Sequence, residues 1–289
     1  MSEFARRLVA AEEDTDLLCV EISSIASLGA GSCCGGWLQF PSTVARTINS
    51  TDSAQEDFLS SLLLKTDAYR PRQQSLPRME NADFLAMRKA VVDWFNKVSI
   101  SYDFANETVV AALSNFDRYV SVTLEPVTDF LLLQLAAYVA LLVASKMSET
   151  APLRMKSLAN LTGRMFTPQQ VQNCEIDMIS KLHFRLAPPS ADETLQCLSS
   201  LLHNSVTSTV PVSDLLSTGS YYLQKARART CWFRHSPYTL AVAALATAYN
   251  SLGLGPLRRS LLRECDARAR RVTGRGVDLH GVAACSEAM

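Results

Sequence analysis

Neither sign of charge is in excess in this chain of 289 residues. Its 28 lysines and arginines are balanced by 28 aspartates and glutamates, so the net charge is zero. Proteins that bind nucleic acids or anionic membrane surfaces rely mainly on an excess of basic side chains. The balance therefore argues against nucleic acid and against a membrane as the main partner.

Sequence motifs of common enzymes and metal sites are missing as well. The chain contains no G-x-S-x-G, no H-E-x-x-H and no phosphate-binding G-x-x-x-x-G-K-[ST] motif, and its four histidines do not cluster. Its eight cysteines include no C-x-x-C pair. We therefore interpret the cysteines as reduced thiols of an intracellular protein, and we expect no catalytic residue, no metal and no cofactor.

One apolar run dominates the chain. Residues 130–145 carry no charge, and Gln134 is their only strongly polar side chain. A helix that is apolar on every side either crosses a membrane or lies at the centre of other helices. A membrane span needs ~20 predominantly apolar residues, so we interpret this run as too short to be one. It predicts the central helix of a helical domain.

Amphipathic segments flank the apolar run on both sides. From Asn81 onward, apolar side chains recur at helical spacing. Asn106 is expected to cap the second helix of this series, and the sequence Thr167-Pro-Gln-Gln170 is a capping-box signature for the fifth. Five helices are therefore predicted before the break at residues 187–190.

The second half of the chain repeats this layout in weaker form. A second capping box begins at Ser190, and residues 239–249 form another nearly uncharged segment. The predicted fold class is all-α, with two five-helix domains, a short N-terminal helix and a disordered N-terminal tail. The predicted boundaries are 1–52 for the flexible tail, 53–188 for the first domain, 189–275 for the second and 276–289 for a C-terminal tail.

Four segments in the first half resemble the motifs of the cyclin family. M-R-K-A-V-V-D-W at 87–94 is similar to the family's M-R-A-I-L-V-D-W, and S-N-F-D-R-Y-V-S at 114–121 resembles N-Y-x-D-R-F-L-S. Residues 133–149 resemble the pattern L-Q-L…A-S-K-x-E-E, and residues 175–186 resemble E-x-x-x-L-x-x-L-x-F-x-L. The resemblance covers about 55–190 and implies a cyclin box there, while the second domain resembles a cyclin box by its helix pattern only.

Two charged residues of these motifs lie among apolar neighbours. Arg88 is on the first predicted helix and Asp117 is on the second. Isolated buried charges are costly, so we expect the two side chains to pair across the helices. The resemblance implies that this pair is the family's internal salt bridge.

The resemblance also implies a partner, a cyclin-dependent Ser/Thr kinase that the protein would bind and activate. In the family, a lysine after the central helix and a glutamate on the fifth helix face outward together and hold the regulatory helix of the kinase. The positions implied for kinase binding are Lys146, Glu175, Phe184, Val143 and Glu149.

A second surface is implied for substrate docking. Cyclins bind R-x-L peptides on a patch formed by the first and third helices of the box. The matching positions here are Met87, Ala90, Val91, Trp94 and Gln134. Ala90 stands where the family has a larger isoleucine, so we expect a shallower or differently selective groove.

The N-terminal segment contains a short motif of its own. Leu17, Cys19 and Glu21 fit the L-x-C-x-E pattern with which D-type cyclins bind retinoblastoma-type pocket proteins. Three fixed residues are a weak motif alone, but an acidic cluster precedes them and a cyclin-box pattern follows. The sequence therefore resembles a D-type cyclin of the G1/S transition most, with an extended docking peptide in its tail.

Two other interpretations remain open at this stage. A transcription-type cyclin, or a non-catalytic helical adaptor, would share the box without control of the cell cycle. We expect the protein in the nucleus and the cytoplasm. The arginine-rich segment after Gly253 is either a nuclear-import signal or, as such clusters more often are, a solvated helix face.

Overall fold

A computed structural model describes residues 52–123, 130–161, 165–206 and 210–289. These residues form helices joined by short connections, and no strand occurs among them. The predicted all-α class is therefore confirmed for the described part of the chain. In chain order the elements are α4 (Asp52–Lys65), η1 (Thr66–Tyr69), η2 (Gln73–Ser75), α5 (Leu76–Met79), α6 (Ala82–Tyr102), α7 (Asn106–Thr123), α8 (Phe130–Ser148), α9 (Met155–Leu161), α10 (Pro168–Lys181), α11 (Ala191–Val206), α12 (Val212–Ala226), α13 (Cys231–Arg234), α14 (Pro237–Ser251), η3 (Gly255–Leu257), α15 (Arg258–Thr273) and α16 (Leu279–Ala288).

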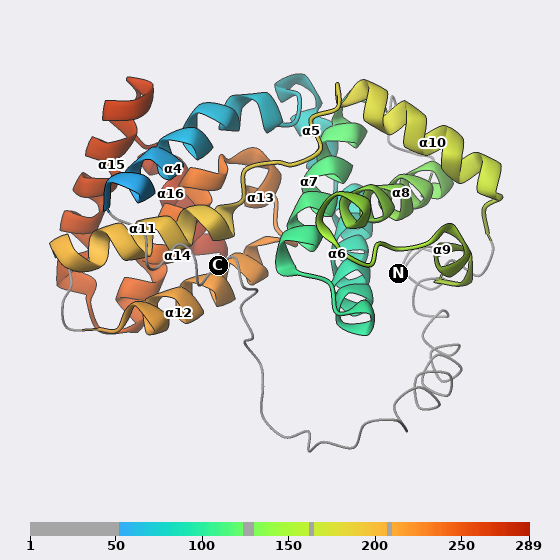
Figure 1. The fold of residues 1–289 in the computed structure, drawn as a ribbon. Helices are drawn as coiled ribbons and strands as arrows, with labels where there is room; N and C mark the ends of the chain where they lie inside the picture. The colour runs from blue at the N-terminus through green and yellow to red at the C-terminus, as the bar shows by residue number, and fades with distance from the viewer. Residues whose placement is uncertain (1–51, 124–129, 162–164, 207–209) are drawn as a thin grey trace, which may run out of the picture.

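Helix α8 is the centre of a first helical group. It packs against α6, α7 and α10 (Figure 1), and every residue from Leu133 to Ser145 is buried. The helix has 19 residues with a mean hydropathy of 1.9, so length and composition alone would let it cross a membrane. The sequence argument from length was therefore wrong. Burial shows instead that α8 is a central helix of the fold, because 72% of its apolar window lies inside the protein.

The helix caps agree with the sequence at two places and differ at a third. Thr167 and Gln170 form the expected capping box at the start of α10. Ser190 accepts from the Asp192 amide, while its own amide donates to Glu193, which reproduces the second box. Asn106 was expected to cap α7, but its side-chain oxygen accepts from Arg227 at 2.6 Å. A long-range contact has taken the place of a local cap.

A second helical group surrounds α14. This helix is buried along almost its whole length and packs against α11, α12, α15 and α16. From the sequence, residues 276–289 were predicted to be a C-terminal tail. The structure corrects this prediction, because α16 lies in the second helical group and buries Val282 and Cys285. Its small, weakly periodic residues gave no helical pattern.

The N-terminal helix α4 packs on the second group rather than the first. In Figure 1 it lies beside α11 and α15, at the far end from α8. Leu59 contributes to the core there, and the Cys197 thiol donates to the Gln55 carbonyl at 3.1 Å. Arg268 of α15 forms an ion pair with Glu56 of α4. The domain boundary predicted at residue 53 stays a prediction, although α4, which falls inside the predicted first domain, packs on the second helical group.

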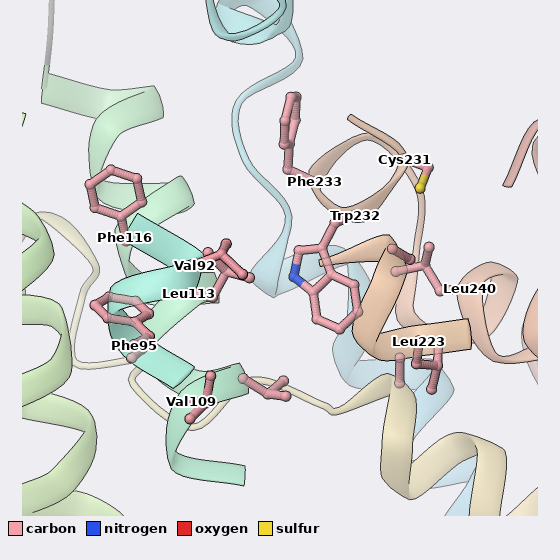
Figure 2. Packing of buried hydrophobic residues seen from close by; sticks show 14 of the residues in the cluster. Val92, Phe95, Val109, Leu113, Phe116, Leu223, Cys231, Trp232, Phe233 and Leu240 are labelled. Carbon is pink, nitrogen blue, oxygen red and sulfur yellow. The ribbon is translucent and has the colours of Figure 1, made fainter. Parts of the chain in front are cut away.

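The one-turn helix α13 packs between the two groups. Figure 2 shows Trp232 with Val92 and Leu113 of the first group on one side and Leu223 and Leu240 of the second on the other. All five side chains are buried. Trp232 therefore holds the two helical groups together, because an aromatic side chain buries a large apolar area on both of its faces.

Candidate functional site

Arg88 and Asp117 form the buried salt bridge that the sequence predicts. Arg88 donates from Nε and Nη2 to the two carboxylate oxygens of Asp117, each at 2.8 Å, and its side chain is 0% exposed. Burial raises the pKa of Asp117, and the adjacent guanidinium opposes that rise. The remaining Arg88 nitrogen, Nη1, donates to the Arg227 carbonyl at 2.6 Å. The pair therefore joins α6 to α7 and also to the second helical group.

Lys146 and Glu175 form a second ion pair at the surface. Lys146 ends the buried part of α8, and Glu175 lies on the adjoining helix α10. The Lys146 Nζ and Glu175 Oε1 atoms are 2.6 Å apart. The Lys146 side chain is 44% exposed and that of Glu175 is 15% exposed. The structure thus brings together two residues that the sequence separates by 29 positions.

Exposed apolar side chains lie next to this ion pair in the sequence. Met147 follows Lys146, Ile176 follows Glu175, and both are exposed. Large apolar side chains in water mark a contact surface when they accompany fixed polar groups. The exposed apolar residues Met147, Ile176 and Phe184, with the ion pair Lys146–Glu175, are called the outer face below.

Phe184 is held in an unfavourable backbone conformation. Its φ is 58° and its side chain is 78% exposed, directly after the end of α10. The left-handed region costs a residue other than glycine about 1–3 kcal/mol. A hydrogen bond from the Phe184 amide to the Ile179 carbonyl at 3.0 Å closes this turn. The Phe184 ring is therefore exposed to solvent on a backbone conformation that costs conformational free energy.

Two residues that the sequence assigned to this surface lie elsewhere. Val143 is only 2% exposed, because it lies within the buried stretch of α8. Glu149 points to the start of α7, where its carboxylate accepts from the Ala105 amide at 2.8 Å and from the Thr108 hydroxyl. It satisfies donors at that helix terminus, as a capping side chain does. Neither side chain lies where the resemblance implies, and kinase contact by either residue stays a prediction.

The predicted docking patch is mostly covered. Met87 and Val91 of α6 are buried, whereas Ala90 and Trp94 are half-buried. Gln134 of α8 is buried, and its amide donates to the Tyr138 hydroxyl at 2.5 Å. The Tyr138 ring packs on Trp94 with 4.8 Å between ring centroids. The five residues do come together, but peptide docking there stays a prediction.

The pocket-protein motif, Leu17, Cys19 and Glu21, lies outside the described residues. The cysteines that the structure describes, Cys174, Cys197, Cys231, Cys265 and Cys285, are free thiols. Within the described ranges, no group of three or more His, Cys, Asp or Glu side chains is placed to hold a metal ion.

Sequence reasoning missed two buried arginines that join separate helices of the fold. Arg227 links the two helical groups through Asn106 and through its carbonyl to Arg88. Arg268, interpreted as part of a solvated arginine cluster, is buried and paired with Glu56 and Glu264. An arginine's exposure depends on the helices that pack over it, so the sequence carried no signal for either residue.

Comparisons with known proteins find likeness mainly in the first helical group. The family profile described as "Cyclin, N-terminal domain" matches residues 57–187. A G2/mitotic-specific cyclin of Daucus carota, C13-1, is 28% identical over 148 residues, which are 51% of this chain and 42% of that protein. Cyclin-A3-2 of Arabidopsis thaliana is 30% identical over 125 residues, 42% of this chain and 33% of that protein. The chain thus spans less than half the length of these relatives.

A solved structure extends the likeness in fold to both helical groups. The viral cyclin from Herpesvirus saimiri superposes with a TM-score of 0.54 at 19% identity, over 80% of this chain and 97% of that one. At that identity the likeness concerns the fold alone. The relatives named above are A-type and mitotic cyclins, so they give no support for D-type character. The profile match, the four motifs and the buried Arg88–Asp117 pair therefore make residues 57–187, which are less than half of the chain, similar to a cyclin N-terminal domain.

Proposed function

We propose that this protein is a non-catalytic regulatory subunit that binds and activates a cyclin-dependent Ser/Thr kinase in the cell cycle. The observation that carries the proposal is the outer face, where the Lys146 and Glu175 side chains meet at 2.6 Å and the residues that follow them in sequence, Met147 and Ile176, are exposed and apolar. The names of the related proteins, which are cyclins, support the same role.

The outer face suits a helix of a partner protein. A paired lysine and glutamate present both a donor and an acceptor, and the rings and chains of Phe184 and Ile176 supply apolar contact area. A kinase becomes active when its own lysine–glutamate pair forms next to the nucleotide. By binding the kinase's mobile helix in its active position, the protein would shift the kinase toward a state that it already samples.

The test replaces Lys146 and Glu175 together with alanine. We expect the double variant to fold, and to lose co-purification with the kinase and stimulation of its activity. The matched control is Lys89→Ala with Asp93→Ala, because these residues form another exposed ion pair, on α6. Kinase activation by the outer-face variant at the level of the control would refute the proposal.

The finer proposal concerns the phase of the cell cycle. We propose a G1/S role of the D-type kind, in which Leu17, Cys19 and Glu21 bind a retinoblastoma-type pocket protein. Support comes only from these three residues and their acidic flank. A calorimetric titration of peptide 12–24 against the pocket domain should show saturable binding that Glu21→Lys abolishes. Without heat from the unchanged peptide, a transcription-type cyclin or a helical adaptor becomes the better interpretation.

We further propose that the protein occurs in the nucleus and the cytoplasm. Support comes from the exposed arginines Arg259, Arg263 and Arg271 on α15, which form a basic surface. A fluorescent fusion should lose nuclear signal when these three residues become glutamine, while Lys89→Gln leaves it unchanged. An unaltered distribution would leave the surface as a solvated helix face only.

A further inference from the structure

A strongly basic cavity lies where the connection after η1 meets α7 and the end of α10. It has a volume of about 140 Å³, which is room for a polyatomic ion and not only for one water molecule. Among the ten described residues that line it, six carry a basic side chain and none carries a carboxylate. The six are Arg70, Arg72, Arg118, Lys181, His183 and Arg185.

Arg118 is the unusual member of this group, because it is buried without a counter-charge from any residue that the structure describes. Its side chain donates to the Arg185 carbonyl at 2.6 Å and to the Asn115 side-chain oxygen at 3.3 Å, and it stacks on the Tyr69 ring at 4.8 Å. All three partners are neutral. Burial lowers the pKa of Arg118 to about 10, so the guanidinium is still charged at neutral pH.

The other buried arginines in the described part of the chain show what such a group normally requires. Arg88 is bound by Asp117, Arg227 lies 3.5 Å from Asp192, and Arg268 is paired with Glu56 and Glu264. Each of these arginines has a carboxylate within 4 Å, because a buried charge is costly without one. Arg118, which is 5% exposed, has no carboxylate partner among the described residues.

The rim of the cavity adds positive charge that is not neutralised. The side chains of Arg72 and Arg185 are exposed and have no hydrogen-bond or ion-pair partner in the ranges that the structure describes. Lys181 is paired with Asp177 at 2.9 Å, on the side of α10. The Arg72 amide donates to the Ser121 hydroxyl at 3.1 Å, which fixes the connection against α7. Two guanidiniums therefore remain free beside a buried third.

We propose that this cavity binds a phosphate-class oxyanion, with Arg118 at its base and Arg72 and Arg185 at its rim. Guanidinium groups match the oxygens of phosphate in geometry and donate two bonds at once. The ion has two possible sources, free inorganic phosphate or the phosphorylated side chain of a protein. The site borders His183, the residue before Phe184, but the proposal does not depend on kinase binding.

The experiment titrates the full-length protein calorimetrically with two probes at constant ionic strength. One probe is inorganic phosphate, and the other is phosphothreonine with an N-acetyl and a C-methylamide group. The variant Arg72→Gln with Arg185→Gln should weaken the binding of at least one probe tenfold or more. It keeps Arg118 and the Arg185 carbonyl, so the buried contacts of the fold persist. The matched control is Arg259→Gln with Arg263→Gln, which removes two exposed arginines from α15.

The outcomes separate the two sources and can also refute the site. Tighter binding of the phosphothreonine probe would assign the site to a phosphorylated protein. Equal or tighter binding of inorganic phosphate would assign it to the free ion. Absence of saturable binding for both probes, or equal weakening in the control variant, would overturn the proposal. If the variant Arg72→Gln with Arg185→Gln still activated the kinase, the anion site would be functionally separate from the outer face.

Discussion

The two ion pairs of the first helical group are alike in distance and opposite in surroundings. Arg88 and Asp117 meet at 2.8 Å in the interior, and Lys146 and Glu175 meet at 2.6 Å at the surface. A buried charge that loses its partner remains desolvated, whereas an exposed charge is taken up by water. Distance therefore says little about stability, and burial decides which pair the fold depends on and which is available to a partner.

Breaking the buried pair should give the largest effect. Arg88→Ala leaves the Asp117 carboxylate buried without its cation and also removes the bond to the Arg227 carbonyl. Removal of one partner from a buried ion pair costs about 3–5 kcal/mol. We expect a clear fall in the denaturant midpoint, measured by circular dichroism.

The neighbouring lysine provides the control for that experiment. Lys89→Ala removes an exposed ion pair with Asp93 on the same helix, and such pairs contribute about 0.3–0.5 kcal/mol. If Arg88→Ala destabilised the protein no more than Lys89→Ala, the contrast between inner and outer pairs would fail.

At Glu149 we expect a loss of stability between those at the buried and the exposed ion pair. Glu149→Ala removes the acceptor for the Ala105 amide and the Thr108 hydroxyl at the start of α7. Loss of a capping side chain costs about 0.5–2 kcal/mol. Thermal unfolding should show this loss, and Glu149→Gln should show less of it, since its amide oxygen still accepts. Equal stability of both variants and the unchanged protein would mean that Glu149 is not a structural cap.

The smallest effect on stability is expected at the outer pair. Lys146→Ala with Glu175→Ala should change the free energy of unfolding by no more than ~1 kcal/mol, since surface pairs contribute little. The same variant should abolish kinase activation. A large loss of stability here would show that the pair serves the fold, and the loss of activation could then no longer be assigned to the interface.

Sequence reasoning reached the helices because local rules set them, and it reached the Arg88–Asp117 salt bridge because isolated buried charges are costly. The stripe on α6 and the capping boxes at Thr167 and Ser190 depend on neighbours within four residues. Arg88 and Asp117 were paired on physical grounds, since each charge lay among apolar residues and needed the other. The residues of the outer pair came from the resemblance to a known family, not from the pattern.

The sequence could not predict whether a side chain faces solvent or a neighbouring helix. Helix α8 is apolar on every side, so its sequence marks no face as outward, and Val143 was assigned to a surface although it is buried. Glu149 bonds α7 rather than solvent, because of where the start of α7 lies in space. Both errors arise where the answer depends on a neighbouring helix.

The sequence by itself determined the helical class, the two apolar central helices and the residues of the cyclin motifs, because periodicity and composition are local properties. Only the tertiary structure decided that α4 packs on the second helical group, that α16 is a helix, and that Arg118 is buried with no carboxylate partner among the described residues. Packing between distant segments settles which charges lose water and which find partners, and no spacing along the chain encodes that.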